Sequence, residues 1–363
     1  MAVRSPVLLS LLVFTLVGAC TQAAPAEPSP QVSPAEATGD LTGIRSYLLA
    51  KTADLRAQTV ALSDSSSTYF DLIEAHDFDY AAAWQEQPDQ VAGLVVEMRQ
   101  AWLRASPLYE QMEGIVAGVP SLSAYDVVLD AGATGAEDPE NAAPYDLTLP
   151  DGRVLERPGN LFGVTESTLW GTWPDFRIDI AADLDDDGSI EFGEVSLPDA
   201  GVIRAAAERM DQTAAELQAS AEAWQPTLAD AFTALVVMVP TMSEYFESWK
   251  NSRFVAGDQS QQRDFVVVSR LSDIVDILES LQVVFQSIEP LTAALDTVQS
   301  DQVEAGLADL QTFVADVHAQ ESAGRQYTAE EADVLGAEAQ DRATAIAGHI
   351  TQMAGRLGVE LPE

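Results

Sequence analysis

The stretch L-S-D-I-V-D-I-L-E-S-L-Q-V-V-F-Q-S-I, residues 271–288, decides the fold. Its apolar residues recur at intervals of three and four: Leu271, Ile274, Leu278, Leu281, Phe285 and Ile288. Because an α-helix completes a turn in 3.6 residues, this spacing places all six on one face, which predicts a helix with one buried side. Similar stripes run through residues 202–224, 303–317 and 346–357, so we predict an all-α fold.

Several residues mark where these helices begin and end. Thr328 is followed three positions later by Glu331, which is the capping-box pattern at the start of a helix. Pro226, Pro240 and Pro290 predict breaks or bends between helices, because proline lacks the backbone N–H that a helix needs.

A weak internal similarity predicts two lobes. The pair Tyr69-Phe70 stands twenty-two residues before an amphipathic stretch starting near Val91, and Tyr245-Phe246 stands at the same distance before one near Val267. A two-lobed helical bundle with an internal pseudo-repeat explains this spacing. Chance similarity between two amphipathic helices is the alternative.

The middle of the chain changes character. Residues 130–160 are rich in proline and small residues, and L-T-L-P-D-G-R-V-L at 147–155 reads as a small hairpin whose turn is Pro-Asp-Gly. We expect an irregular insertion between the lobes, because a long non-helical excursion in a helical protein is usually functional or a packed surface loop.

A calcium-type loop follows this insertion. The sequence D-L-D-D-D-G-S-I-E-F-G-E, residues 183–194, matches the twelve-residue loop of an EF-hand, with Gly188 at the sharp turn and Ile190 expected to point into the core. Carboxylate and carbonyl oxygens at these positions are the ligands that Ca²⁺ prefers. The expected ligands are the side chains of Asp183, Asp185 and Asp187, the carbonyl of Ser189, Glu191 directly or through water, and Glu194 bidentately.

The flanks of this loop differ from those of a paired EF-hand. Pro174 precedes Asp183 by nine residues, Pro198 follows Glu194 by four, and the chain has no second loop of this pattern. We therefore expect a single structural Ca²⁺ site with a Kd of about 10⁻⁴–10⁻³ M, as in extracellular modules. An acidic turn that binds nothing is the alternative.

The N-terminus predicts export. A short, mostly apolar run over residues 7–17 follows a weakly basic start, and V-G-A-C at 17–20 ends it with small residues before a cysteine. This ending resembles the lipobox of bacterial lipoproteins, in which Cys20 would be acylated and anchor the protein to a membrane, with outer-membrane sorting in a Gram-negative cell. Ordinary signal cleavage with an idle cysteine is the alternative. Since Cys20 is the only cysteine, no disulfide can form within the chain.

The charge of the chain restricts its partners. Among 363 residues the formal net charge is −40, and only Lys51 and Lys250 are lysines. Such a surface repels phosphates, so we exclude nucleic acid as a partner. The charge favours cation capture or reflects adaptation to salty or acidic surroundings. The sequence identifies no protein partner.

One segment carries a family resemblance. The stretch F-G-V-T-E-S-T-L-W-G, residues 162–171, resembles the helix that bears the His-x-x-Glu motif of imelysin-like proteins, which include periplasmic iron-uptake lipoproteins. The resemblance implies an all-helical, two-lobed bundle with a metal site in the cleft, frequent lipid anchoring, and a peptidase label. Glu166 matches the motif glutamate, whereas Gly163 stands at the histidine position, so a site here would need other ligands.

His76 is the histidine with the most metal-like surroundings. It lies in E-A-H-D-F-D, residues 74–79, which offers mixed nitrogen and oxygen ligands, although a solvated helix end explains the same pattern. Glu166 and His76 are therefore the candidates for a second metal site, and iron is its candidate ion.

These observations define the expected organisation and function. The preferred hypothesis is a lipid-anchored, extracytoplasmic, non-enzymatic binding protein with structural Ca²⁺; an iron-uptake component with a cleft metal site is the first alternative. A metallopeptidase is the second, which the missing histidine disfavours. The expected segments are a signal peptide (1–19), a disordered tether (20–39), an N-terminal helical lobe (40–175) with a loop at 130–160, a calcium-binding segment (176–199) and a C-terminal helical lobe (200–363).

Overall fold

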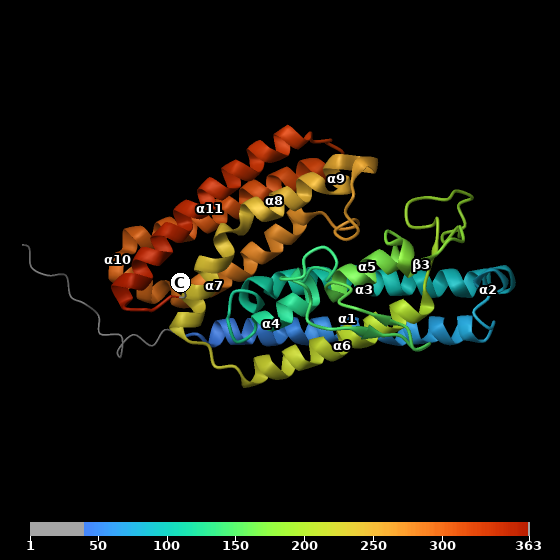
Figure 1. Ribbon diagram of the computed structural model, residues 1–363. Helices are drawn as coiled ribbons and strands as arrows, with labels where there is room; N and C mark the ends of the chain where they lie inside the picture. Colours follow the sequence, from blue (N-terminus) through green and yellow to red (C-terminus); the bar gives the residue numbers. More distant parts are fainter. Residues whose placement is uncertain (1–39, 362–363) are drawn as a thin grey trace, which may run out of the picture. The chain divides into compact units, whose positions relative to one another are not determined.

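The computed structural model describes residues 40–361, and helices form nearly all of its regular structure (Figure 1). The α-helices are α1 (Thr42–Glu74), α2 (Tyr80–Glu86), α3 (Pro88–Val116), α4 (Ser123–Asp126), α5 (Leu161–Leu169), α6 (Ala200–Ala223), α7 (Leu228–Met238), α8 (Met242–Asn251), α9 (Arg253–Ala256), α10 (Arg270–Ser322) and α11 (Ala329–Leu357). Short 3-10 or π-helical turns are η1 (Val127–Ala131), η2 (Pro174–Phe176), η3 (Val239–Thr241) and η4 (Gly257–Gln259), and the strands are β1 (Leu147–Thr148), β2 (Val154–Leu155), β3 (Arg177–Ile178) and β4 (Leu197–Pro198).

The helix predicted over residues 271–288 forms the first part of α10. The six apolar residues of its stripe are each at most 1 % exposed, so the predicted buried face is the real one. The predicted all-α fold is confirmed, since the strands are only two residues long. The predicted capping box is also present, with Thr328 and Glu331 bonding reciprocally at the start of α11.

Within residues 40–361, the helices pack in two groups that belong to one compact unit. In the N-terminal lobe, α1 lies along α3 and α6, and α5 packs against α3 and α6 (Figure 1). In the C-terminal lobe, α10 and α11 pack against each other and against α7 and α8. Helix α10 also packs against α3, which joins the lobes. The expected two-lobed bundle is confirmed.

The position of α6 corrects the expected start of the C-terminal lobe at residue 200. This helix packs against α1 and α5, because its apolar surface is wider than one stripe. Val202 and Ala206 join Val164 of α5 in a small apolar cluster, while Leu217 belongs to the main core. The chain therefore leaves the N-terminal lobe only after Ala223.

The prolines act as predicted at two positions of three. Pro226 lies between α6 and α7, and Pro240 lies in the turn η3. Pro290, however, lies inside α10, and the backbone leaves the helical conformation six residues later, at Asp296 (φ −162°, ψ 95°). The Asp296 carboxylate accepts the N–H of Gln299 at 3.2 Å, so this aspartate caps the second part of the helix.

Two short antiparallel ladders organise the insertion between the lobes. The predicted hairpin is present, with Leu147 of β1 paired with Leu155 of β2. A second ladder pairs Ile178 of β3 with Leu197 of β4 and thereby closes the base of the acidic loop at residues 183–194. Strands rather than two long helices therefore carry this loop.

The predicted signal peptide, the predicted tether and Cys20 lie outside the described residues. Within residues 40–361, no helix combines the length and the apolar character that a membrane-spanning segment requires.

Candidate metal centre

Three buried carboxylates meet between the lobes. Glu110 and Glu113 lie one turn apart on α3, and Asp130 belongs to η1. Each side chain offers an oxygen within 4.8 Å of the others, and the residues are only 2 %, 4 % and 5 % exposed. Charged carboxylates are almost never buried without a partner, so this acid cluster needs a compensating ion or protons.

The surrounding groups only partly compensate the acid cluster. Arg270 of α10 lies 2.8 Å from Asp273 and 3.9 Å from Glu110. The Tyr245 hydroxyl donates to Glu113 Oε1 at 2.7 Å. The second oxygens of Glu110 and Glu113 are buried and have no hydrogen-bond partner among the described residues. Such orphaned oxygens point to a missing ligand or proton.

Burial changes the protonation of these acids. It raises the pKa of Glu110 and of Asp130 well above their ordinary values. It also raises the pKa of Asp126 to about 7 and that of Asp273 to about 6. One guanidinium cannot balance five carboxylates, so several of them hold protons when no cation is present.

A cavity opens onto this cluster. Its volume is about 760 Å³, and Glu113, Asp130, Tyr245 and Arg270 lie on its wall. Much of the remaining wall comes from the α8–α10 connection, residues 252–269. The acid cluster is therefore accessible from a space that is larger than a single ion.

The motif glutamate, Glu166, lies beside the same cavity but binds the backbone of a neighbouring loop. Glu166 is 1 % exposed, and its carboxylate accepts the backbone N–H groups of Phe265, Val266 and Val267 at 2.6–3.1 Å. Burial raises its pKa to about 8, although these three donors act in the opposite direction. Glu166 thus fastens the α8–α10 connection to α5.

Gly163, at the histidine position of the motif, is closely surrounded by two polar side chains. A Cβ atom there would lie 2.9 Å from Asp264 Oδ2 and 3.0 Å from Asn160 Oδ1. Asn160 caps α5 by accepting the N–H of Gly163 at 2.6 Å. The Asp264 carboxylate therefore lies where the motif side chain would start.

His76 has partners of its own. Its Nδ1 lies 2.8 Å from the carbonyl oxygen of Leu72, and its Nε2 lies 3.3 Å from Gln87 and 3.7 Å from Glu86. Neither His76 nor Glu166 belongs to a metal-type group of three or more ligands among the described residues. The second metal site that we predicted for this pair stays a prediction, and these contacts give it no third ligand.

The predicted calcium loop brings its first three ligands together. Carboxylate oxygens of Asp183, Asp185 and Asp187 lie within 4.8 Å of one another. The Asp183 carboxylate accepts the N–H groups of Asp187 and Gly188, at 3.2 and 2.8 Å. Glu194 is 8 % exposed, and its two oxygens accept the N–H groups of Leu184 and Glu191, which holds the loop closed.

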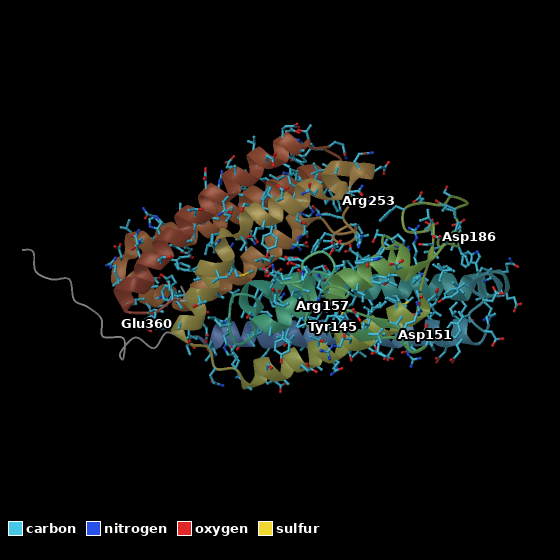
Figure 2. All side chains as sticks on the ribbon, in the orientation of Figure 1. Tyr145, Asp151, Arg157, Asp186, Arg253 and Glu360 are labelled. Carbon is cyan, nitrogen blue, oxygen red and sulfur yellow. The ribbon has the colours of Figure 1, made fainter. Side chains whose placement is uncertain are left out.

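The apolar residue of this loop is exposed, contrary to our expectation. Ile190 was expected to point into the core, yet it is 47 % exposed, and Phe192 is 41 % exposed. Leu184 enters the core instead. The Arg253 guanidinium of α9 lies over the ring of Phe192, 3.4 Å from its centroid. Figure 2 labels Arg253 and, on the acidic loop, Asp186.

The acid cluster was missed by the sequence reasoning, although a signal exists. Glu110 and Glu113 form an E-x-x-E pattern within α3, where the neighbouring Tyr109 and Met112 are fully buried. Two carboxylates on the buried face of an amphipathic helix are a warning of a polar site. Arg270 and Asp130 carry no comparable local pattern.

Comparison with known proteins agrees with this architecture. No curated protein matches the chain. A family model described as imelysin, whose name also labels a peptidase, matches residues 43–350. Since this match covers most of the chain, the protein belongs to the imelysin family.

Proposed function

We propose that the protein is a non-enzymatic, extracytoplasmic metal-binding protein that captures iron in the cavity between its lobes. The observation that carries this proposal is the acid cluster, in which Glu110 and Glu113 each keep one buried oxygen without a hydrogen-bond partner. Asp130 supplies a further carboxylate oxygen to the same group, and the cavity gives access from solvent.

The charges of this site favour a cation over an uncharged or anionic ligand. Five buried carboxylates face one guanidinium: Glu110, Glu113, Asp126, Asp130 and Asp273 against Arg270. If all ionise, the group carries a net charge of −4, which is costly in a buried site unless an ion or protons balance it. Carboxylates are hard ligands and suit hard cations rather than soft ones.

Metal titration of paired variants tests this proposal. Isothermal calorimetry with Mn²⁺ and with ferric nitrilotriacetate should show a site that disappears in the isosteric variant Glu110→Gln with Glu113→Gln. Glu97→Gln is the matched control, because Glu97 lies on the same helix but is exposed. If neither metal binds the folded wild-type protein, the proposal is wrong.

The absence of catalysis is part of the proposal. A zinc hydrolase site typically combines histidine ligands with an open position for water. The described structure places none of the three histidines in a group of metal-type ligands. Hydrolysis of a peptide library that stops when a zinc chelator is added would instead support the metallopeptidase.

A structural Ca²⁺ in the acidic loop is our second proposal. It is supported by the convergence of Asp183, Asp185 and Asp187 and by the closure of the loop through Glu194. Ser189 and Glu191 complete the expected ligand set. A bound cation would neutralise these carboxylates and stiffen the connection between β3 and β4.

Thermal unfolding with added Ca²⁺ tests this second site. For a Kd of about 1 mM, roughly 10 mM Ca²⁺ should stabilise the protein by about 1.4 kcal/mol. The variant Asp183→Ala with Glu194→Gln should lose this gain, whereas Asp186→Asn should keep it, because Asp186 is not one of the expected ligands. Equal responses of both variants would argue against the site.

The membrane anchor is a proposal that rests on the sequence. Acylation of Cys20 would place the metal-binding unit outside the cytoplasmic membrane. Metabolic labelling with palmitate should mark the wild-type protein and fail for Cys20→Ser. Release of unlabelled wild-type protein in soluble form would contradict the anchor.

A further inference from the structure

A tyrosine brings a further oxygen to the acid cluster. Tyr245 belongs to α8 of the C-terminal lobe, whereas Glu113 belongs to α3 of the N-terminal lobe. The Tyr245 hydroxyl donates to Glu113 Oε1 at 2.7 Å, and both residues lie on the wall of the cavity beside Asp130. Tyr245 is 8 % exposed, so its hydroxyl points into a site rather than into bulk solvent.

The distance between these oxygens matches neighbouring ligands of one ion. In an octahedral site with metal–oxygen distances of about 2.0 Å, adjacent ligand oxygens lie about 2.8 Å apart. The Tyr245 and Glu113 oxygens already have this separation. This is an ordinary hydrogen-bond length, and it is also compatible with an ion that takes the place of the hydroxyl proton and contacts both oxygens.

We propose that Tyr245 is a ligand of the metal ion and that its phenolate makes the site select trivalent over divalent cations. The proposal rests on the function proposed above and deepens it. When the ion binds, one metal–oxygen bond forms at the phenol oxygen, and the phenol proton leaves to solvent. No oxidant or reductant takes part.

Burial and the neighbouring Glu113 carboxylate raise the pKa of Tyr245 well above its ordinary value, so only a strongly charged cation would displace the phenol proton. The Arg270 guanidinium lies 4.9 Å from the centroid of its ring, so the negative phenolate gains a second cationic neighbour. A phenolate adds a full negative charge to the ligand set, and its attraction to an ion grows with the charge of that ion. Fe³⁺ therefore gains more from Tyr245 than Mn²⁺ or Ca²⁺ does.

The chain offers a matched control in Tyr109. Its hydroxyl donates to Asp126 Oδ1 at the same distance, 2.7 Å, and Tyr109 is fully buried. Neither Tyr109 nor Asp126 lines the cavity, and Asp126 is not part of the metal-type group of Glu110, Glu113 and Asp130. The change Tyr109→Phe thus removes a similar hydroxyl without removing the proposed ligand.

Spectroscopy of the iron-loaded protein tests the assignment. Titration of the full-length protein with ferric nitrilotriacetate should produce a visible phenolate-to-iron charge-transfer band, and resonance Raman excitation in that band should enhance tyrosinate vibrations. Tyr245→Phe should lose the band and weaken Fe³⁺ binding by roughly tenfold or more, equivalent to about 1.4 kcal/mol. Its affinity for Mn²⁺ should change by less than about threefold. Tyr109→Phe should keep the band.

The possible failures are distinguishable. If wild-type protein binds Fe³⁺ without a charge-transfer band, or if Tyr245→Phe keeps the band, the assignment of Tyr245 is overturned while the metal site stands. If neither Fe³⁺ nor Mn²⁺ binds, the proposed function and the assignment of Tyr245 are both wrong. Circular dichroism of each variant establishes that it is folded, and Tyr245→His, which restores a metal ligand but no phenolate, should recover affinity without the band.

Discussion

The contacts of the Glu166 carboxylate give the motif glutamate a structural role that does not depend on the motif histidine, which is Gly163 here. Its three backbone donors, from Phe265 to Val267, make it a fastening point for the α8–α10 connection. Such a role needs only an acceptor. It does not need a histidine at position 163, where Asp264 already fills the space.

We expect Glu166→Gln to lower the free energy of unfolding by about 1–3 kcal/mol, because an amide nitrogen faces at least one N–H group that then has no acceptor. A protonated carboxyl oxygen still accepts, so the loss should appear on both sides of pH 8. Urea denaturation measures it. Glu304→Gln, an exposed change on α10, should have almost no effect. Equal stability of the two variants would remove the fastening role.

Gly163→His should fail to restore a motif-type metal site. The new Cβ would approach Asp264 Oδ2 to 2.9 Å, a contact that real side chains avoid. We expect a loss of about 1–3 kcal/mol in the free energy of unfolding and no gain in zinc affinity. Adding Asp264→Ala should recover part of the stability. A stable single variant that binds zinc more tightly than wild type would contradict this account.

Among the elements, the helices were the most predictable, because each buries a stripe that repeats with the helical period. The six stripe residues of residues 271–288 are buried as predicted. We predicted the break in α10 at Pro290, but it lies at Asp296. A proline only removes one backbone N–H donor, whereas the Asp296 carboxylate caps the helical segment that follows it. The expected burial of Ile190 was wrong, since it presumed a core contact that the loop between β3 and β4 does not make.

The start of α11 provides a prediction for an element. Thr328 caps this helix by accepting the N–H of Glu331 at 3.2 Å, and Glu331 in turn accepts the N–H of Thr328 at 2.9 Å. Thr328→Ala should therefore lower the free energy of unfolding by about 1 kcal/mol. Thr351→Ala, an exposed change within the same helix and away from its start, should change it little. Chemical denaturation measures the free energy of unfolding of both variants. Equal values for the two would show that the cap does not stabilise the protein.

For the whole molecule, the sequence predicted the lobes and the family but not the acid cluster. Its members come from α3 and η1, and the packing of the lobes adds their partners Tyr245 of α8 and Arg270 of α10. Glu110 and Glu113 alone form a local pattern. Such a pattern is hard to recognise among fifty-eight acidic residues, since most of them lie at the surface in contact with water and contribute to the net charge of −40.

The stability of the metal-free protein should fall as pH rises. Burial raises the pKa of Asp276 to about 6, from 3.8, so between these values the folded state keeps a proton that the unfolded state has lost. Asp276→Asn removes this term while its oxygen can still accept from Gln111. At pH 7.5 we expect the variant to exceed wild type by about 1–2 kcal/mol, after allowance for partial exposure, and at pH 4 to match it.

Denaturation curves at several pH values measure this difference, with the exposed Asp301→Asn on the same helix as the control. A constant offset between Asp276→Asn and wild type from pH 4 to pH 7.5 would refute the linkage.

The bonds between Glu166 and the α8–α10 connection also set the order of events in folding. They join residues 99 to 101 positions apart in the chain, so they form only after α5 and the start of α10 have come together. Contacts of such long sequence separation carry a loop-closure cost and tend to form late. We therefore expect the wall of the cavity to be completed late in folding, so that a chain that has not yet folded has no site for a metal ion.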